Sequence, residues 1–300
     1  MAAPTQDRSS DDEMSAFRPS QEGIRMPQPP TFATSAEERL HRKQQLAGAF
    51  RIFGRFGFGE GIAGHITVRD PEDPHMFWVN PFGMSFRHIR VSDLIAVNHD
   101  GDIVHGNRPV NQAGFVIHSA VHHAHPEVVA AAHAHSVYGK AWSSLARPLD
   151  PITQDACTLY ENHGVVTEGR GAVVLDPITQ DACTLYGNHT VVTEGAGAVV
   201  VDEEAGRLLA EGLGDNAMCF HRNHGIFTVG HTVAEAAWWF INTERNCQAA
   251  LLAEAAGTPT QIDHQNAKFT AEQTGTPYAG WFSYQPLWDE VVRTDPDLFD

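Results

Sequence analysis

The residues Ala131-Ala-His-Ala-His-Ser136 end a short apolar run that starts at Val128, which is typical of a buried strand. Side chains two positions apart on a strand point to the same face, so His133 and His135 are expected to lie side by side at the strand end. Neutral imidazole is the commonest metal ligand in proteins, and zinc needs a third ligand from elsewhere. Because the chain contains 18 histidines, the pair indicates either a metal site or two histidines held by hydrogen bonds.

Composition restricts the class of protein. The 300 residues are 42% hydrophobic, enough for the core of one large domain or two small ones. The formal charge of -17 argues against a general binder of nucleic acid or of anionic membranes. We find neither a signal-peptide core nor a window of about 18 apolar residues, so no membrane span is expected. The four widely spaced cysteines predict a reduced, cytoplasmic protein.

The chain divides into three parts by composition. Residues 1–33 are rich in Ser, Asp, Gln and Pro, which predicts a disordered N-terminal tail. Residues 34–257 carry the periodic patterns of a single domain. Residues 258–300 are polar with aromatic anchors, and we expect this C-terminal tail to pack on its own domain or on a neighbouring subunit.

Before the histidine pair, the sequence predicts a helix, several short strands and a second helix. Ser35-Ala-Glu-Glu38 has the pattern of a capping box that opens the first helix. Short strands in succession favour an antiparallel sheet. His118 and His122 lie on one side of the second helix and are alternative metal ligands. The predicted elements are helix 36–55, strands 65–69 and 77–79, the hairpin 94–97 with 102–104, and helix 111–125.

After the pair, Ser136 is placed to cap a short helix that runs to about Ala146. Two further strands flank the turn His221-Arg-Asn-His-Gly225. Thr232-Val-Ala-Glu235 has the pattern of a second capping box, and the long helix that it opens ends at Gly257. The remaining predicted elements are helix 202–213 and strands 217–220 and 226–229.

A 26-residue unit occurs twice, at 149–174 and 175–200, and 23 of the 26 positions agree. Two copies at this identity indicate a tandem duplication, because a solenoid needs at least three units. Only one copy can occupy a given place in a compact sheet. We expect the second copy to take it, since Gly187 gives the turn after Tyr186 more backbone freedom than Glu161 gives the first copy.

The order of the motifs resembles the class II aldolase/adducin family. The motifs are His133-Ala-His135 on a strand, Asn223-His-Gly-Ile226 about 90 residues later, and a long capped helix. Gly64-His-Ile-Thr-Val-Arg69, Asn80-Pro-Phe-Gly83 and His118 fit earlier segments of the family, and the run after Pro109 and the C-terminal tail are closest to its adducin-like branch. The resemblance extends over roughly residues 35–285.

The resemblance implies an α/β fold, a three-layer α/β/α sandwich on a mostly antiparallel central sheet. It also implies a homotetramer with sites between subunits. By the resemblance, His133, His135 and His224 hold a zinc ion or another divalent transition metal. A tyrosine lent by a neighbouring subunit, which matches Tyr160 or Tyr186, would be the proton donor.

The chain also departs from the family. Gly114 stands where the aldolases carry a general acid/base carboxylate, a group typically worth about 10²–10⁴-fold in rate. His65 stands where they have Asn, and Phe82 where they have Thr, so a phosphorylated substrate is not expected. The predicted substrate-binding residues are Gly64, His65, Asn80, Gly83, Asn111 and Gln112.

These observations favour a zinc-dependent, aldolase-like lyase that acts on a small hydroxy-carbonyl compound. The alternative is a non-catalytic, adducin-like assembly domain associated with the actin cytoskeleton. Retention of all three histidines, and the absence of a Lys-rich tail of the adducin kind, favour the lyase. A zinc hydrolase is a third interpretation, for which the sequence offers no dedicated motif.

Overall fold

A computed structural model of the chain describes residue 17, residues 23–166 and residues 203–300. These residues form an eight-stranded sheet in the order β4-β3-β2-β1-β5-β8-β7-β6. Every neighbouring pair is antiparallel except β6 and β7, which are parallel. The strands are β1 (His65–Arg69), β2 (Met76–Val79), β3 (Ile95–Asn98), β4 (Ile103–His105), β5 (Ala130–Ala134), β6 (His163–Val166), β7 (Met218–His221) and β8 (Gly225–Gly230).

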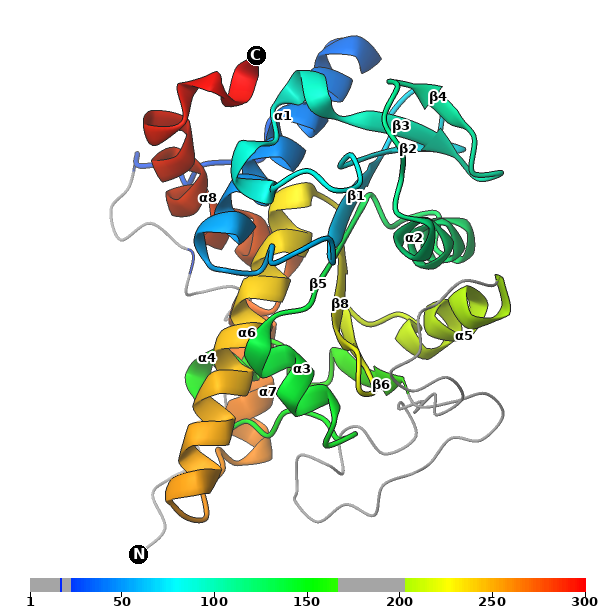
Figure 1. The fold of residues 1–300 in the computed structure, drawn as a ribbon. Coiled ribbons are helices and arrows are strands. Elements are labelled where there is room, and N and C mark those ends of the chain that lie inside the picture. The colour runs from blue at the N-terminus through cyan, green and yellow to red at the C-terminus, as the bar shows by residue number, and fades with distance from the viewer. Residues whose placement is uncertain (1–16, 18–22, 167–202) are drawn as a thin grey trace, which may run out of the picture.

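Helices cover both faces of the sheet, as Figure 1 shows. One face packs against α2 and α5, and the other against α1 and α6, on which α8 packs in turn. This arrangement confirms the predicted α/β/α sandwich on a mostly antiparallel sheet. None of the described helices is both long and apolar enough to cross a membrane. The helices are α1 (Ser35–Arg55), α2 (Gln112–Ala124), α3 (Val137–Ser143), α4 (Gln154–Cys157), α5 (Glu203–Leu213), α6 (Val233–Ala256), α7 (His264–Thr274) and α8 (Pro277–Thr294).

The central strand β5 is buried along its whole length. Its alanines alternate between two cores: Ala132 packs in the core under α1 and α6, whereas Ala131 packs in the core under α2 and α5. The small side chains let helices approach the sheet closely from both sides. The antiparallel register sets His133 opposite His65 of β1 and opposite Phe227 of β8.

Two helix starts differ from the prediction. The capping box of α1 is formed by Thr34 and Glu37, one residue earlier than the predicted pair. Ser136 occupies the N-cap position of α3, but its side chain makes no capping hydrogen bond to the helix backbone. Instead the buried carboxylate of Glu244 in α6 accepts hydrogen bonds from the N–H groups of Tyr138 (3.0 Å) and Gly139 (2.6 Å). A side chain 105 positions along the chain from Gly139 therefore caps the helix, which no local pattern could reveal.

The C-terminal segment contains two helices where the sequence predicted only a tail. Thr276 caps α8, Pro277 stands in its first turn, and Pro286 lies inside it. An internal proline is unfavourable in a helix, so the local pattern gave no helical signal. Tertiary packing decides the outcome, because Tyr284 is fully buried in the core under α1 and α6. Arg51 of α1 also donates to Asp297 at 2.9 Å.

The first copy of the repeat, not the second, supplies the described elements α4 and β6. The expectation for the second copy was therefore wrong. Glu161 adopts a left-handed backbone with φ of 59°, as the turn requires, although this conformation is unfavourable for a residue with a side chain. A Cβ at Gly164 would make a tight contact of 3.3 Å with the carbonyl oxygen of Gly212, and the second copy has Thr190 at that place. The second copy, like most of the predicted N-terminal tail, lies outside the described residues.

We predict that a variant lacking residues 175–200 keeps the fold. The described sheet uses only the first copy, and the entropic effect of an inserted loop grows only as the logarithm of its length, on the order of 1 kcal/mol here. Circular dichroism and thermal unfolding should show one cooperative transition close to that of the full chain.

A second variant adds Gly164→Thr to the chain that lacks residues 175–200, and the two shortened chains are compared. Crowding against Gly212 should then lower stability by about 1–3 kcal/mol. Loss of cooperative unfolding on removal of 175–200 alone would show that both copies are structural.

Candidate metal centre

Three histidines converge at one end of the central strands. His133, His135 and His224 each offer a ring nitrogen, and these atoms all lie within 4.8 Å of one another. Their ring centroids are 4.8 to 5.1 Å apart. Within the described part of the chain, this is the one group of three or more His, Cys, Asp or Glu side chains with such spacing. The predicted ligand set is thus brought together, although its occupant is not shown.

A backbone hydrogen bond orients His133. Its Nδ1–H donates to the carbonyl oxygen of Ile226 on β8 at 2.7 Å. This bond fixes the tautomer and leaves Nε2 bare, and in metal sites the second ring nitrogen is usually held in this way. Among the described residues Nε2 has no hydrogen-bond partner although it is buried. A buried nitrogen without a partner is unfavourable, and a metal ion would satisfy it.

His224 lies in the turn that joins β7 to β8. The preceding residue, Asn223, has a left-handed backbone with φ of 57°, a conformation that asparagine tolerates better than most residues. The turn is closed by the His224 N–H, which donates to the His221 carbonyl at 3.0 Å. Nδ1 of His224 is buried without a partner among the described residues.

His135 lies just beyond the end of β5 and is exposed. The residue that follows is anchored, because Ser136 Oγ donates to Glu244 Oε2 at 2.6 Å. The same carboxylate caps α3, so the backbone of His135 is held between a buried strand and a capped helix. A rigid backbone on both sides fixes the third ligand.

Electrostatics keep the cluster neutral. Burial lowers the pKa of His224 to about 3, with His221 and His135 adding repulsion. Burial also holds the pKa of His133 well below its ordinary value, and burial followed by the Lys140 charge lowers the pKa of His135. Neutral imidazoles have free lone pairs, which metal binding requires. The residues therefore fit a divalent transition metal with three nitrogen ligands and an open position.

A cavity of about 370 Å³ opens beside the cluster. His135 and His224 line it, together with one cationic side chain, Lys140. The amide residues Asn111 and Asn223 are also in its wall. The rest of the lining is Ile62, Ala63, Gly64, His65, Phe82, Ala113 and Ile117. A metal site, a cation and a mainly apolar wall suit a small organic anion with a hydrocarbon body.

The predicted substrate-binding residues divide into two groups. Gly64, His65 and Asn111 line the cavity, and Asn111 also caps α2 by accepting from the Gly114 N–H. The other three do not belong to the lining. Asn80 is buried, while Gly83 and Gln112 are exposed.

The structure places the predicted proton donor away from the cluster of its own chain. The hydroxyl of Tyr160 is 2.9 Å from His264 Nδ1, and the ring packs with Cys157 and Ala267 between α4 and α7. Tyr160 is absent from the cavity lining. Tyr186 lies outside the described residues.

The alternative ligands His118 and His122 belong to a different arrangement. His118 Nε2 is 2.7 Å from His65 Nδ1, and His118 Nδ1 is 2.6 Å from Thr67 Oγ1. His122 Nε2 is 2.9 Å from the same hydroxyl. All four side chains are buried, and we call them the His65–His122 chain. Burial, followed by repulsion from neighbouring histidines, holds the pKa of His65 and of His118 well below the ordinary value.

Sequence reasoning missed Lys140, Asn223 and the members of the His65–His122 chain as a unit. Asn223 directly precedes a predicted ligand, and Lys140 follows His135 by five residues. Position relative to the histidine motifs could have suggested both. The His65–His122 chain of hydrogen bonds joins β1 to α2 through Thr67, and no spacing rule in the sequence connects these two segments.

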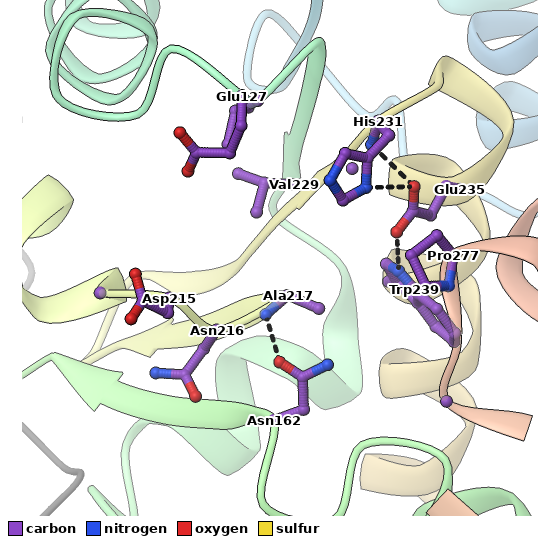
Figure 2. Close-up of a pocket in the computed structure, with 14 residues that line it drawn as sticks. Glu127, Asn162, Asp215, Asn216, Ala217, Val229, His231, Glu235, Trp239 and Pro277 are labelled. Atoms are coloured by element: carbon purple, nitrogen blue, oxygen red, sulfur yellow. Dashed lines mark hydrogen bonds and ion pairs between the residues drawn. The ribbon is translucent and has the colours of Figure 1, made fainter. Parts of the chain in front are cut away.

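A second cavity, of about 320 Å³, lies at the opposite end of β8 and is shown in Figure 2. Its buried carboxylate, Glu235, accepts from the His231 N–H at 2.7 Å and lies 3.3 Å from Trp239 Nε1. Glu127 and Asp215 also line the cavity. Its buried charge is already satisfied by neighbouring groups, so the histidine cluster remains the candidate site.

Comparison with known proteins shows which family the chain belongs to. Residues 44–251 match the sequence model of the class II aldolase and adducin N-terminal domain. "Decarboxylase NovR" of Streptomyces niveus is 40% identical, over 90% of this chain and 91% of that protein. The alpha-adducin of Mus musculus is 30% identical over 86% of this chain but only 32% of that protein. The solved structure "L-fuculose 1-phosphate aldolase from Glaciozyma antarctica PI12" is 39% identical, covers 91% of this chain and 96% of that one, and superposes with a TM-score of 0.76.

We predict that the purified protein carries about one zinc ion per chain and that His135→Ala releases it. The exposed ligand can be removed without opening a buried cavity, so the fold should persist. Elemental mass spectrometry measures the zinc, and thermal unfolding checks the fold. His123→Ala, in the last turn of α2, is the matched control and should keep its zinc. Full occupancy in His135→Ala would assign the ligands to other side chains.

Stability should fall below pH 6.5 because of His122. Burial, together with repulsion from Arg69, lowers its pKa from 6.5 to about 3 in the folded chain. Between these values the unfolded chain binds the proton and the folded chain does not. The free energy of unfolding should therefore fall by about 1.4 kcal/mol per pH unit for this group as pH drops from 6.5 towards 3. Denaturant unfolding of wild type and His122→Gln at several pH values tests this, and equal pH slopes would contradict it.

Proposed function

The chain belongs to the class II aldolase and adducin family, and from that membership and its three-histidine cluster we propose a zinc-dependent lyase. The reaction that we propose breaks a carbon–carbon bond next to the carbonyl group of a small organic acid. The observation that carries the proposal is the cavity itself, which His135 and His224 line together with Lys140, the one cationic side chain among its described lining residues.

His133, His135 and His224 would hold the metal through neutral nitrogens. When bound there, zinc supplies a Lewis acid that polarises a carbonyl oxygen. Lys140 would bind a carboxylate of the substrate through its ammonium group, which has no hydrogen-bond or ion-pair partner within the described residues. Asn111 and Asn223 offer amide groups to further oxygens. The apolar wall excludes water and accepts the hydrocarbon part of the substrate.

The lining of the cavity favours loss of carbon dioxide over aldol cleavage. Aldol cleavage needs a base to remove a hydroxyl proton, and no Asp or Glu is among the described residues that line the cavity. In a 3-oxo acid, the bond from the α-carbon to the carboxyl carbon breaks and its electron pair becomes the enolate. Carbon dioxide leaves, and water later protonates the carbon. No base is needed for bond cleavage, and the name of the relative from Streptomyces niveus fits a reaction of this class.

The assembly function is the weaker alternative. The similarity to alpha-adducin spans only 32% of alpha-adducin, whereas the similarity to the decarboxylase from Streptomyces niveus spans 91% of that decarboxylase. An intact metal-binding cluster also has no evident use in a purely structural domain. We further propose a homotetramer with sites between subunits, the assembly that the family resemblance implies. Within its own chain, Tyr160 contacts His264 and does not line the cavity.

Benzoylacetate, an aromatic 3-oxo acid, is a suitable first probe. Zinc-loaded protein should release carbon dioxide from it faster than buffer with equal free zinc. Fuculose 1-phosphate should be cleaved weakly or not at all, because Gly114 supplies no base and Phe82 no phosphate donor. Coupled assays for carbon dioxide and for aldehyde follow the two reactions.

Lys140→Ala should raise KM for benzoylacetate about tenfold to hundredfold, the worth of one hydrogen bond to a charged group. Lys140→Arg keeps the charge and should raise KM by less. His135→Ala should abolish turnover. Cleavage of fuculose 1-phosphate at rates on the order of 1–10³ s⁻¹ would overturn the assignment and identify an aldolase.

A further inference from the structure

Gly114 is glycine because a neighbouring ring occupies the space of its side chain. A Cβ at this position would lie 2.4 Å from Cδ2, 2.8 Å from Cγ and 2.9 Å from Nε2 of His65. Real Cβ atoms do not approach other atoms so closely. The imidazole of His65 therefore fills the volume into which a residue at position 114 would project, beside the cavity that His65 lines.

The ring of His65 cannot easily move aside. It is buried at the start of β1, and its Nδ1 is joined to His118 at the head of the His65–His122 chain. Thr67 is two residues further along β1 and lies on the same face, so strand and helix hold the ring together. The other ring nitrogen, Nε2, makes no hydrogen bond within the described part of the chain.

The hydrogens of the His65–His122 chain can be ordered in two directions. Each neutral imidazole carries one hydrogen, and the Thr67 hydroxyl must donate to one of its two imidazole neighbours because it has no other partner among the described residues. His122 Nδ1 is buried and makes no well-formed hydrogen bond within the described part of the chain. The Val128 carbonyl is near enough to raise the pKa of His122, but that oxygen already accepts from Arg69 Nε at 3.1 Å. A hydrogen on His122 Nδ1 would therefore be a buried, poorly paired N–H, which proteins avoid more strictly than an unpaired acceptor.

The favoured direction therefore starts with a hydrogen on His122 Nε2, which donates to Thr67. The Thr67 hydroxyl then donates to His118 Nδ1. Finally His118 Nε2 donates to His65 Nδ1, which leaves the hydrogen of His65 on Nε2.

We propose that His65 takes the place of the missing side chain at position 114 and donates a hydrogen bond from Nε2 to an oxygen of the substrate. In this role His65 is a substrate-binding donor and not a base. Thr67, His118 and His122 are positioning residues that fix its tautomer. A donor at this place would stabilise the negative charge that forms on oxygen when a carbon–carbon bond breaks. The proposal rests on the proposed function for the identity of the ligand, but its steric and tautomer parts stand without metal.

The steric part predicts that Gly114→Ala changes the unfolding temperature in opposite directions when His65 is present and when it is absent. Alanine is normally more stable than glycine inside a helix, and position 114 lies in α2. Gly114→Ala should nevertheless lower the unfolding temperature of the metal-free chain, because the His65 ring is in the way. In the His65→Ala background the same change should raise it. The same sign in both backgrounds would overturn the steric coupling.

Neutron crystallography tests the tautomer directly. Deuterium is expected on Nε2 of His65, His118 and His122. Deuterium on Nδ1 of His65 would overturn the donor assignment and make the cavity-facing nitrogen an acceptor.

The binding part uses oxalate, a small oxygen-rich anion, titrated calorimetrically into zinc-loaded protein. His65→Ala should keep its zinc but bind oxalate about tenfold more weakly or worse. Thr67→Val should weaken binding too, Thr67→Ser should restore it, and the pair His65→Ala with Thr67→Val should be no worse than His65→Ala alone. Thr243→Val, which removes a buried hydroxyl inside α6, is the matched control and should bind as wild type does.

The outcomes separate the two proposals. Unchanged oxalate affinity in zinc-loaded His65→Ala would overturn the role of His65 and leave the lyase intact. Failure of wild type to take up zinc would overturn the proposed function, while the steric and tautomer measurements would still decide whether His65 is the fixed donor.

Discussion

The pairing of β5 between β1 and β8 is the constraint on which the site depends. Antiparallel register sets His133 opposite His65 on one side and opposite Phe227 on the other. The same ladder brings the carbonyl of Ile226 to His133 Nδ1 and places the tight turn with His224 at the strand end. A slip of one residue would turn His133 to the other face of the sheet, so register and ligand geometry are a single property.

Packing so many histidines together lowers their proton affinity. Burial is the largest cause throughout, and mutual repulsion adds to it, as for His133 and His224. The result is a neutral, nitrogen-rich region that spans the metal cluster and the His65–His122 chain. Neutral imidazole is both the form that binds metal and the form whose single hydrogen can be ordered in a chain. The lowered pKa of the buried imidazoles thus suits the three-histidine cluster to metal binding and the His65–His122 chain to ordered hydrogen bonds.

The chemistry that we propose follows from what the cavity contains. Its described lining residues offer a place for a Lewis acid, one cation at Lys140 and one ordered imidazole at His65, and none of them is a carboxylate. Such a set stabilises negative charge on oxygen but is poor at removing protons. Gly114 and His65 are coupled departures from the aldolase pattern, because the ring of one fills the space of the other.

Local patterns of alternation and capping were sufficient to predict most of the helices and strands and to single out the His133/His135 pair, because they are short-range signals. The layered fold and the third ligand, His224, came from the resemblance of the motifs to a family. The fold class was confirmed, and the three histidines lie together as predicted. Local sequence could not show that Glu244 caps α3, that α8 continues through Pro286, or which copy of the repeat enters the sheet. These were decided by packing between residues far apart in the chain. The same holds for Gly114, which the sequence identified only as a missing carboxylate, whereas the tertiary structure shows a ring in its place.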